Sequence, residues 1–332
     1  MPQLLQDSEK GSTFAVPLQM VPIVQLVRAS DCGSEGRGFE SHWAPKYIDR
    51  SSIILAGLIV LDTMGISDYE SVKDLLDVLA ARYNTPEFVA DDPVQFARRF
   101  GEQRDAEIAS LLVSSIAWGK RSMILRNADR MLAILENEPY RFVMEGDIEA
   151  IGEDNIHRTF FGRHLRHYLR ALRLMYRRYG SLEKFAVALD APAAEAPAWT
   201  IAGGINGLLE EANAAHPLDG PNRCIPAQPD TSALKRLNMA LRWLVRDDGI
   251  VDLGMWKALR PAQLYIPLDV HSGNTARGLG LLDRRQNDRR AVEELTGRLR
   301  RFNAADPVIY DFALFGVGVN GDTYMDSPQI IG

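Results

Sequence analysis

The chain has 332 residues, of which 46% are hydrophobic and 25% charged, a composition typical of globular proteins. Its two cysteines, Cys32 and Cys224, are too few for a disulfide framework or for a metal or iron–sulfur site built from four thiolates. The net charge of -6 argues against a protein that is basic throughout, as many nucleic-acid binders are, but it leaves room for one basic face.

The sequence predicts neither a membrane span nor a signal peptide. Its longest apolar run, from Ile53 to Leu61, is much shorter than the roughly 20 residues that cross a bilayer. The N-terminus lacks a basic start followed by an apolar core. We therefore expect a cytoplasmic protein that does not contact the membrane.

Residues 1–63 differ from the rest of the chain. The stretch from Gln25 to Ser41 is dense in glycine and serine and has neither helical nor strand periodicity. It looks like the conceptual translation of a transfer-RNA gene, because Gly38-Phe-Glu-Ser41 can be encoded by GGG-TTC-GAA-TCC, which contains the T-arm sequence. We expect residues 1–63 to be a spurious or disordered extension before a start at Met64, with a genuine flexible tail as the alternative.

From Asp68 onward, apolar residues recur every three or four positions, as in amphipathic helices. Asn84-Thr-Pro86 ends the first helix, because proline disfavours helical geometry in the residue before it. Asp91-Asp92-Pro93 resembles the cap and first turn of a short helix, and Trp118-Gly119 separates the two helices of residues 104–135. Later helices are expected near residues 160–179, 201–214, 233–246, 272–279, 289–302 and 306–315, with a short turn at 255–259.

Strand patterns are nearly absent, so we predict an all-α fold. Residues 189–232 are rich in alanine, proline and glycine and connect two helical parts. The expected organisation is a single domain over 64–332 with two lobes, about 64–188 and 233–320.

One predicted helix carries a basic ridge. Five arginines spaced three and four apart lie on one of its faces: Arg163, Arg166, Arg170, Arg173 and Arg177. Such a ridge is either a solvated face paired with acidic residues or a surface that contacts phosphates.

The most specific stretch runs from Ile266 to Leu281. Asp269-Val270-His271 resembles the Asp-Thr-His segment of the helix-hairpin-helix DNA glycosylases, and Leu279-Gly-Leu281 follows at the family's spacing. The resemblance implies a two-lobed helical fold of that kind and assigns Asp269 as the catalytic carboxylate. A further interpretation needs no catalysis, because Asp269 is also well placed to cap the helix that follows.

Other segments widen the resemblance. Ser110–Gly119, Leu237–Arg246 and Asp306–Gly316 give an overall pattern, from about Tyr69 to Val319, that is similar to a bacterial family described only as uncharacterised. That family is more distantly similar to the glycosylases.

The chain also departs from the glycosylase pattern. The region that corresponds to the hairpin, about Asp247 to Leu264, has no Gly-x-Gly, so the expected hairpin is degenerate. No lysine stands at the family's spacing before Asp269, and Lys257 is more easily explained as a surface residue. Asn274 occupies a position where family members often carry arginine. An active enzyme would therefore be monofunctional, using water as the nucleophile.

We expect a DNA-glycosylase-like protein that acts on or recognises altered bases in DNA. Trp118, His271 and Asn274 are the expected pocket residues, and Arg121, Arg242 and Arg246 join the ridge arginines as expected phosphate contacts. No cofactor and no metal are predicted, since the histidines lack acid-rich metal-ligand spacing. The alternatives are a non-catalytic nucleic-acid-binding module and a helical interaction protein without a nucleic-acid role.

Overall fold

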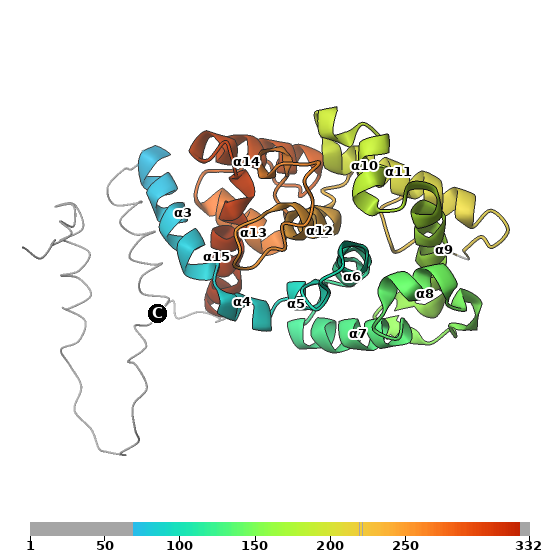
Figure 1. Ribbon diagram of the computed structural model, residues 1–332. Coiled ribbons are helices and arrows are strands. Elements are labelled where there is room, and N and C mark those ends of the chain that lie inside the picture. The colour runs from blue at the N-terminus through green and yellow to red at the C-terminus, as the bar shows by residue number, and fades with distance from the viewer. Residues whose placement is uncertain (1–68, 219, 221, 326–332) are drawn as a thin grey trace, which may run out of the picture. The chain divides into compact units, whose positions relative to one another are not determined.

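Helices make up most of the part of the chain that the computed structural model describes, namely residues 69–218, 220 and 222–325 (Figure 1). The predicted extension over 1–63 and the predicted start at Met64 lie outside these residues. None of the described helices is both long enough and apolar enough to cross a membrane.

The helices follow the order of the chain. They are α3 (Tyr69–Tyr83), α4 (Pro86–Ala90), α5 (Val94–Ala97), α6 (Gln103–Ser115), α7 (Arg121–Ile134), α8 (Pro139–Glu145), α9 (Gly162–Tyr179), α10 (Leu182–Ala188), α11 (Pro197–Ala212), α12 (Lys235–Val245), α13 (Val270–Gly278), α14 (Arg289–Phe302) and α15 (Tyr310–Met325). Two short strands, β1 (Asn155–His157) and β2 (Phe160–Phe161), pair antiparallel ahead of α9.

The prediction of a mainly helical chain is confirmed. Helices occur at every predicted position, and the breaks at residues 84–85 and 116–120 lie where proline and glycine predict them. The short helices α4, α8 and α10 and the β1–β2 pair were not predicted, because segments this short show too little periodicity. Residues 255–259 form bends without helix. The division into two lobes stays a prediction.

The first and last described helices lie side by side. α15 packs along α3 on one side and along α13 on the other (Figure 1). Gly318 permits the close approach of α15 to α13, because a Cβ atom there would lie 2.9 Å from backbone atoms of His271. Elsewhere α12 packs on α6, and α9 packs on α8, α10 and α11.

A buried carboxylate on α6 connects segments that are far apart in the sequence. Glu107 is fully buried, and its Oε1 accepts a hydrogen bond from Trp256 Nε1 at 2.9 Å. Its Oε2 accepts from the Tyr176 hydroxyl at 2.9 Å and from the Leu182 backbone N–H at 2.8 Å. Burial raises the pKa of Glu107, while the hydrogen bonds from the Leu182 N–H and the Tyr176 hydroxyl oppose the shift. The side chain thus fixes α6 against α9, the start of α10 and the segment before η5 (Pro261–Gln263).

Removal of this carboxylate is expected to destabilise the protein strongly. Glu107→Ala leaves several buried donors without acceptors, each costing about 1–3 kcal/mol, so the free energy of unfolding should fall by at least about 3 kcal/mol. Glu102→Ala is the matched control at the N-cap of α6, because the Glu102 side chain makes an exposed ion pair with Arg104 and no buried contact among the described residues. Urea denaturation of both variants measures the difference, and equal losses would contradict the assignment.

Candidate functional site

A cavity of about 940 Å³ opens where several element ends converge. Its walls come from the N-terminal ends of α7, α12 and α13, from α15, from the turn before α5 and from residues 223–226. The volume lies at the upper end of the range of about 300–1,000 Å³ found for small-molecule sites. The cavity is therefore large enough for an organic ligand such as a nucleoside.

Asp269 lies in the wall of this cavity and also caps α13. Its Oδ1 accepts a hydrogen bond from the Ser272 backbone N–H at 2.9 Å, and the Ser272 hydroxyl receives the Asp269 N–H at 3.0 Å. This reciprocal pair is a capping box. Because the cap uses Oδ1, Oδ2 is left for another partner, so capping and a chemical role are compatible at this residue.

That partner is Lys235, in the first turn of α12. Its Nζ lies 3.5 Å from Asp269 Oδ2, and both side chains are part-buried. Lys235 lines the cavity together with Asp269. Leu234, with φ of 47°, adopts a left-handed conformation immediately before the helix. This turn brings an amine and a carboxylate together at one cavity wall.

The predicted pocket residues are only partly brought together. Trp118 and His271 line the cavity, as does Arg121, whose guanidinium lies 5.6 Å from the centre of the Phe315 ring. His271 meets the same ring edge-on. Asn274 is exposed on α13 and does not line the cavity.

A buried histidine fixes the turn that carries Trp118. His157 Nε2 lies 2.8 Å from the Trp118 carbonyl oxygen, and Nδ1 lies 2.9 Å from Asn127 Nδ2. Since a carbonyl only accepts, Nε2 carries the proton and Nδ1 accepts from the amide. Burial lowers the pKa of His157, which favours this neutral form. Arg158 stacks on the Trp118 ring at 4.6 Å, so the indole is held from two sides.

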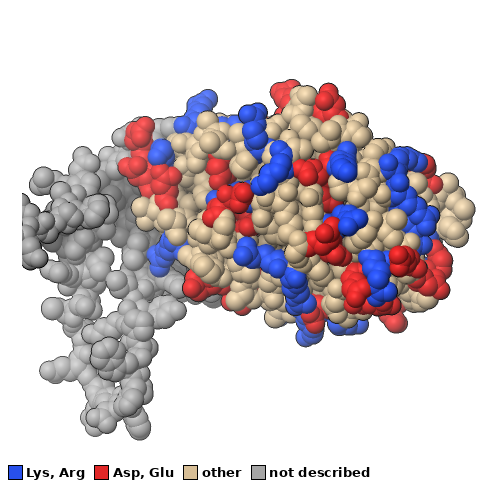
Figure 2. Space-filling view, in the orientation of Figure 1, with Lys and Arg blue, Asp and Glu red and all other residues tan. Residues whose placement is uncertain are grey.

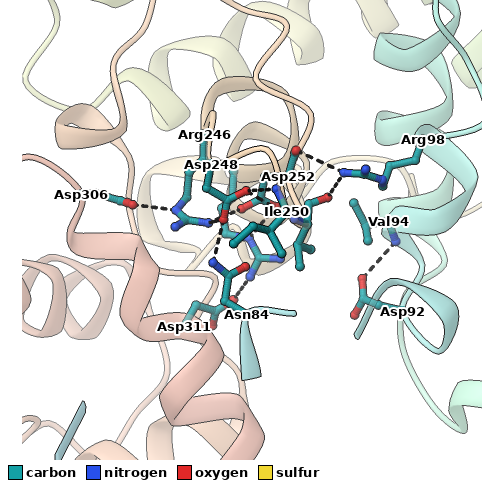
Figure 3. A network of polar contacts seen from close by, with 12 residues as sticks. Asn84, Asp92, Val94, Arg98, Arg246, Asp248, Ile250, Asp252, Asp306 and Asp311 are labelled. Atoms are coloured by element: carbon teal, nitrogen blue, oxygen red, sulfur yellow. Dashed lines mark hydrogen bonds and ion pairs between the residues drawn. The ribbon is translucent and has the colours of Figure 1, made fainter. Parts of the chain in front are cut away.

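The two predicted arginines of α12 belong to a buried network (Figure 3). Arg242 is 3% exposed and pairs with Asp252 and with Asp311 of α15. Arg246 is equally buried and pairs with Asp248, Asp252 and Asp306. Arg242 reaches the cavity wall, whereas Arg246 does not line it. Their guanidinium groups tie α12 to α15 and to the segment that follows α12.

The arginine ridge on α9 lies away from the cavity. Arg166 and Arg170 pair with Glu153 and Glu149, and Arg173 donates to backbone carbonyls at the end of α8. Arg163 lies 3.6 Å from Glu153, and Arg177 is exposed. Positive and negative side chains are interspersed on the face shown in Figure 2. Most of the ridge is thus engaged with acidic or carbonyl oxygens of the same chain.

Among the described residues that line the cavity, cations outnumber carboxylates. The cations are Arg121, Arg223, Lys235, Arg236 and Arg242, and the carboxylates are Asp92, Asp269 and Asp311. Burial raises the pKa of Asp311 to about 6; Asp269 adds to the shift and Arg242 opposes it. Arg121 and Arg223 form no ion pair with any described residue, so both remain able to meet an anionic ligand.

Five of these eight residues were not predicted as site residues, namely Asp92, Arg223, Lys235, Arg236 and Asp311. Lys235 and Asp311 lie far from Asp269 in the sequence, and Asp92 was interpreted only as part of a helix cap. The available signal was the basic first turn of α12, which is unusual because the positive end of a helix dipole disfavours cations. In the part of the chain that the structure describes, no cluster of three or more metal-ligating side chains occurs.

The described part of the chain is thus mainly helical and contains a cavity lined by side chains of both charges. The model of a family described as protein of unknown function (DUF2400) matches residues 92–320, and the chain belongs to this family. The expectation of an uncharacterised family is thereby confirmed. Comparison with the curated proteins and with the solved structures gives no match.

Proposed function

We propose that the protein is a DNA glycosylase that holds an extruded nucleotide in this cavity and cleaves its base–sugar bond. The observation that carries the proposal is the Asp269–Lys235 pair in the wall of a cavity with aromatic and cationic sides. The resemblance of residues 266–281 to the helix-hairpin-helix glycosylases supports the same activity.

The chemistry explains the position of Asp269. Cleavage of the base–sugar bond builds positive charge on the sugar, and a nearby carboxylate stabilises this oxocarbenium-like state. Extrusion of the nucleotide costs roughly a few kcal/mol, which stacking in the pocket and contacts to the phosphates must offset. Trp118 and Phe315 offer aromatic surfaces, and Arg121 and Arg223 offer cations that form no ion pair with a described residue.

A specific observation favours a second step at the same site. The expectation of water as the nucleophile depended on the absence of a lysine at the family's spacing, yet the fold brings Lys235 to Asp269. A lysine amine condenses with the aldehyde of an abasic sugar to an imine, with loss of water. We propose that Lys235 is this amine. The turn at residues 229–234 would then take the place of the hairpin that the sequence analysis assigns to 247–264.

Asp269→Asn is expected to lower base release by about 100-fold or more, because the amide carries no charge to stabilise the sugar cation. Asparagine is as good a helix cap as aspartate, so α13 should persist. The measurement is single-turnover release from a panel of duplexes that each carry one modified base. Binding to a duplex with a tetrahydrofuran abasic analogue should be kept.

Asp288→Asn is the matched control. Asp288 caps α14 in the same way, accepting from the Ala291 N–H at 3.1 Å, but it does not line the cavity. An equal loss of base release in both variants would show that Asp269 acts only as a helix cap. Salt-sensitive binding by the wild type without any base release would indicate a non-catalytic nucleic-acid-binding module, and neither binding nor release would indicate an interaction protein.

Lys235 is expected to form a covalent adduct with abasic-site DNA in the presence of borohydride, which reduces the imine to a stable amine. Lys235→Gln should abolish this adduct on a denaturing gel. Lys120→Gln, which changes an exposed lysine outside the cavity wall, should not. If the wild type releases the base but forms no borohydride-trapped adduct, water is the nucleophile, as the sequence predicts.

Arg121→Ala is expected to weaken DNA binding and to make the plot of log affinity against log salt shallower by about one unit, the effect of losing one phosphate contact. Fluorescence anisotropy on the abasic-analogue duplex at several salt concentrations measures both. Arg177→Ala, on the exposed end of the α9 ridge, should change neither. Weaker binding and a shallower plot in Arg177→Ala, with no change in Arg121→Ala, would place the DNA on the ridge instead of at the cavity.

A further inference from the structure

We propose that Asp92 is a second catalytic carboxyl of this cavity, which donates a proton to the base as it leaves. The inference deepens the proposed glycosylase function and rests on it. It also assigns the substrate class: a neutral modified base, which must be protonated to depart easily, as opposed to an alkylated base that already carries positive charge.

The geometry of Asp92 sets it apart from the other buried aspartates. It is 8% exposed and lies in the turn before α5, in the cavity wall. Its Oδ1 accepts a hydrogen bond from the Val94 N–H at 2.9 Å (Figure 3). Its Oδ2 has no hydrogen-bond partner among the described residues. It forms no ion pair with any described residue, whereas Asp252 and Asp311 are each paired with Arg242. A buried carboxyl, one oxygen of which bonds no described residue, thus lies in the cavity wall.

The surroundings of Asp92 favour its protonated form. Burial raises the pKa of this carboxyl, and the Val94 N–H opposes the shift. The cations that face it, Arg242, Arg121 and Lys235, act in the same opposing sense. Asp269 and Asp311 line the same cavity, and Asp269 keeps its ion pair with Lys235. Two carboxyls of one cavity in unlike environments can take unlike roles, one as proton donor and one as charge stabiliser.

Departure of the base is coupled to the transfer of one proton from Asp92. The bond between the sugar C1′ and the base nitrogen breaks, and its electron pair leaves with the base. The proton on Asp92 moves to an acceptor atom of the base, so that the base departs neutral and Asp92 becomes a carboxylate. The nucleophile, a water molecule or the neutral amine of Lys235, bonds to C1′ and releases one proton to solvent, while Asp269 stabilises the sugar cation. Asp92 then recovers a proton from solvent.

The test compares Asp92→Asn with the wild type. Asparagine keeps an acceptor for the Val94 N–H but cannot donate an acidic proton. We expect single-turnover release of a neutral base, assayed on duplexes with uracil or hypoxanthine among other modified bases, to fall about 100-fold or more. Release of 7-methylguanine, which is already cationic, should be unchanged. Asp91→Asn, at the exposed neighbouring residue, is the control.

The pH profile gives a second measurement. Wild-type release should decline as the pH rises through the pKa of Asp92, because only the protonated carboxyl donates. The Asn variant should lack this limb, and Asp92→Glu should restore part of the rate. Thermal melting and binding to the tetrahydrofuran duplex check that the variants are folded.

Each possible result supports or contradicts the role of Asp92. Loss of neutral-base release with unchanged binding supports the inference. Unchanged neutral-base release in Asp92→Asn overturns it, as does a wild type that releases only 7-methylguanine. Trapping of abasic DNA without release of any base overturns the role of Asp92 but leaves Lys235 in place. Absence of both release and trapping removes the proposed function itself.

Discussion

The site depends on the ion pairs of Arg242 beneath the cavity. Its guanidinium joins α12 to α15 through Asp311 and to the following segment through Asp252, and it lies 4.4 Å from the centre of the Phe312 ring. Breaking such a buried pair leaves an unpaired charge, so the two helices are held in one arrangement. Because Lys235 begins α12 and α13 packs on α15, the same contact sets where the amine and Asp269 meet.

The arginines of the chain fall into two groups, those that pair with other groups of the chain and those left at the cavity. Arg242, Arg246 and most of the α9 ridge neutralise acidic or carbonyl oxygens of the chain itself, whereas Arg121 and Arg223 remain unpaired with described residues at the cavity. A protein with net negative charge can in this way keep a small positive site. The proposed contact with nucleic acid therefore concentrates at the cavity instead of spreading over a basic face.

Several features followed directly from local sequence. Helical periodicity placed the long helices, and Pro86 and Gly119 placed two of the breaks. The motif at residues 266–281 led to Asp269, which does cap α13 and does line the cavity. Trp118 and Arg121 were named together because they are near neighbours in the sequence, and both line the cavity. The positions of these helices, breaks and caps could be predicted because each depends on neighbours along the chain.

What only the tertiary structure decided is which side chains meet. Arginines look alike in a sequence, whether or not a carboxylate lies beside them. Glu149 and Glu153 form ion pairs with arginines of the α9 ridge, whereas no described carboxylate forms an ion pair with Arg121. Likewise Lys235, Asp92 and Asp269 belong to separate segments, and no spacing rule connects them. The sequence determined the helices, the caps and the candidate carboxylate, since these are local. The fold decided the site, because burial and ion pairing depend on contacts between distant segments.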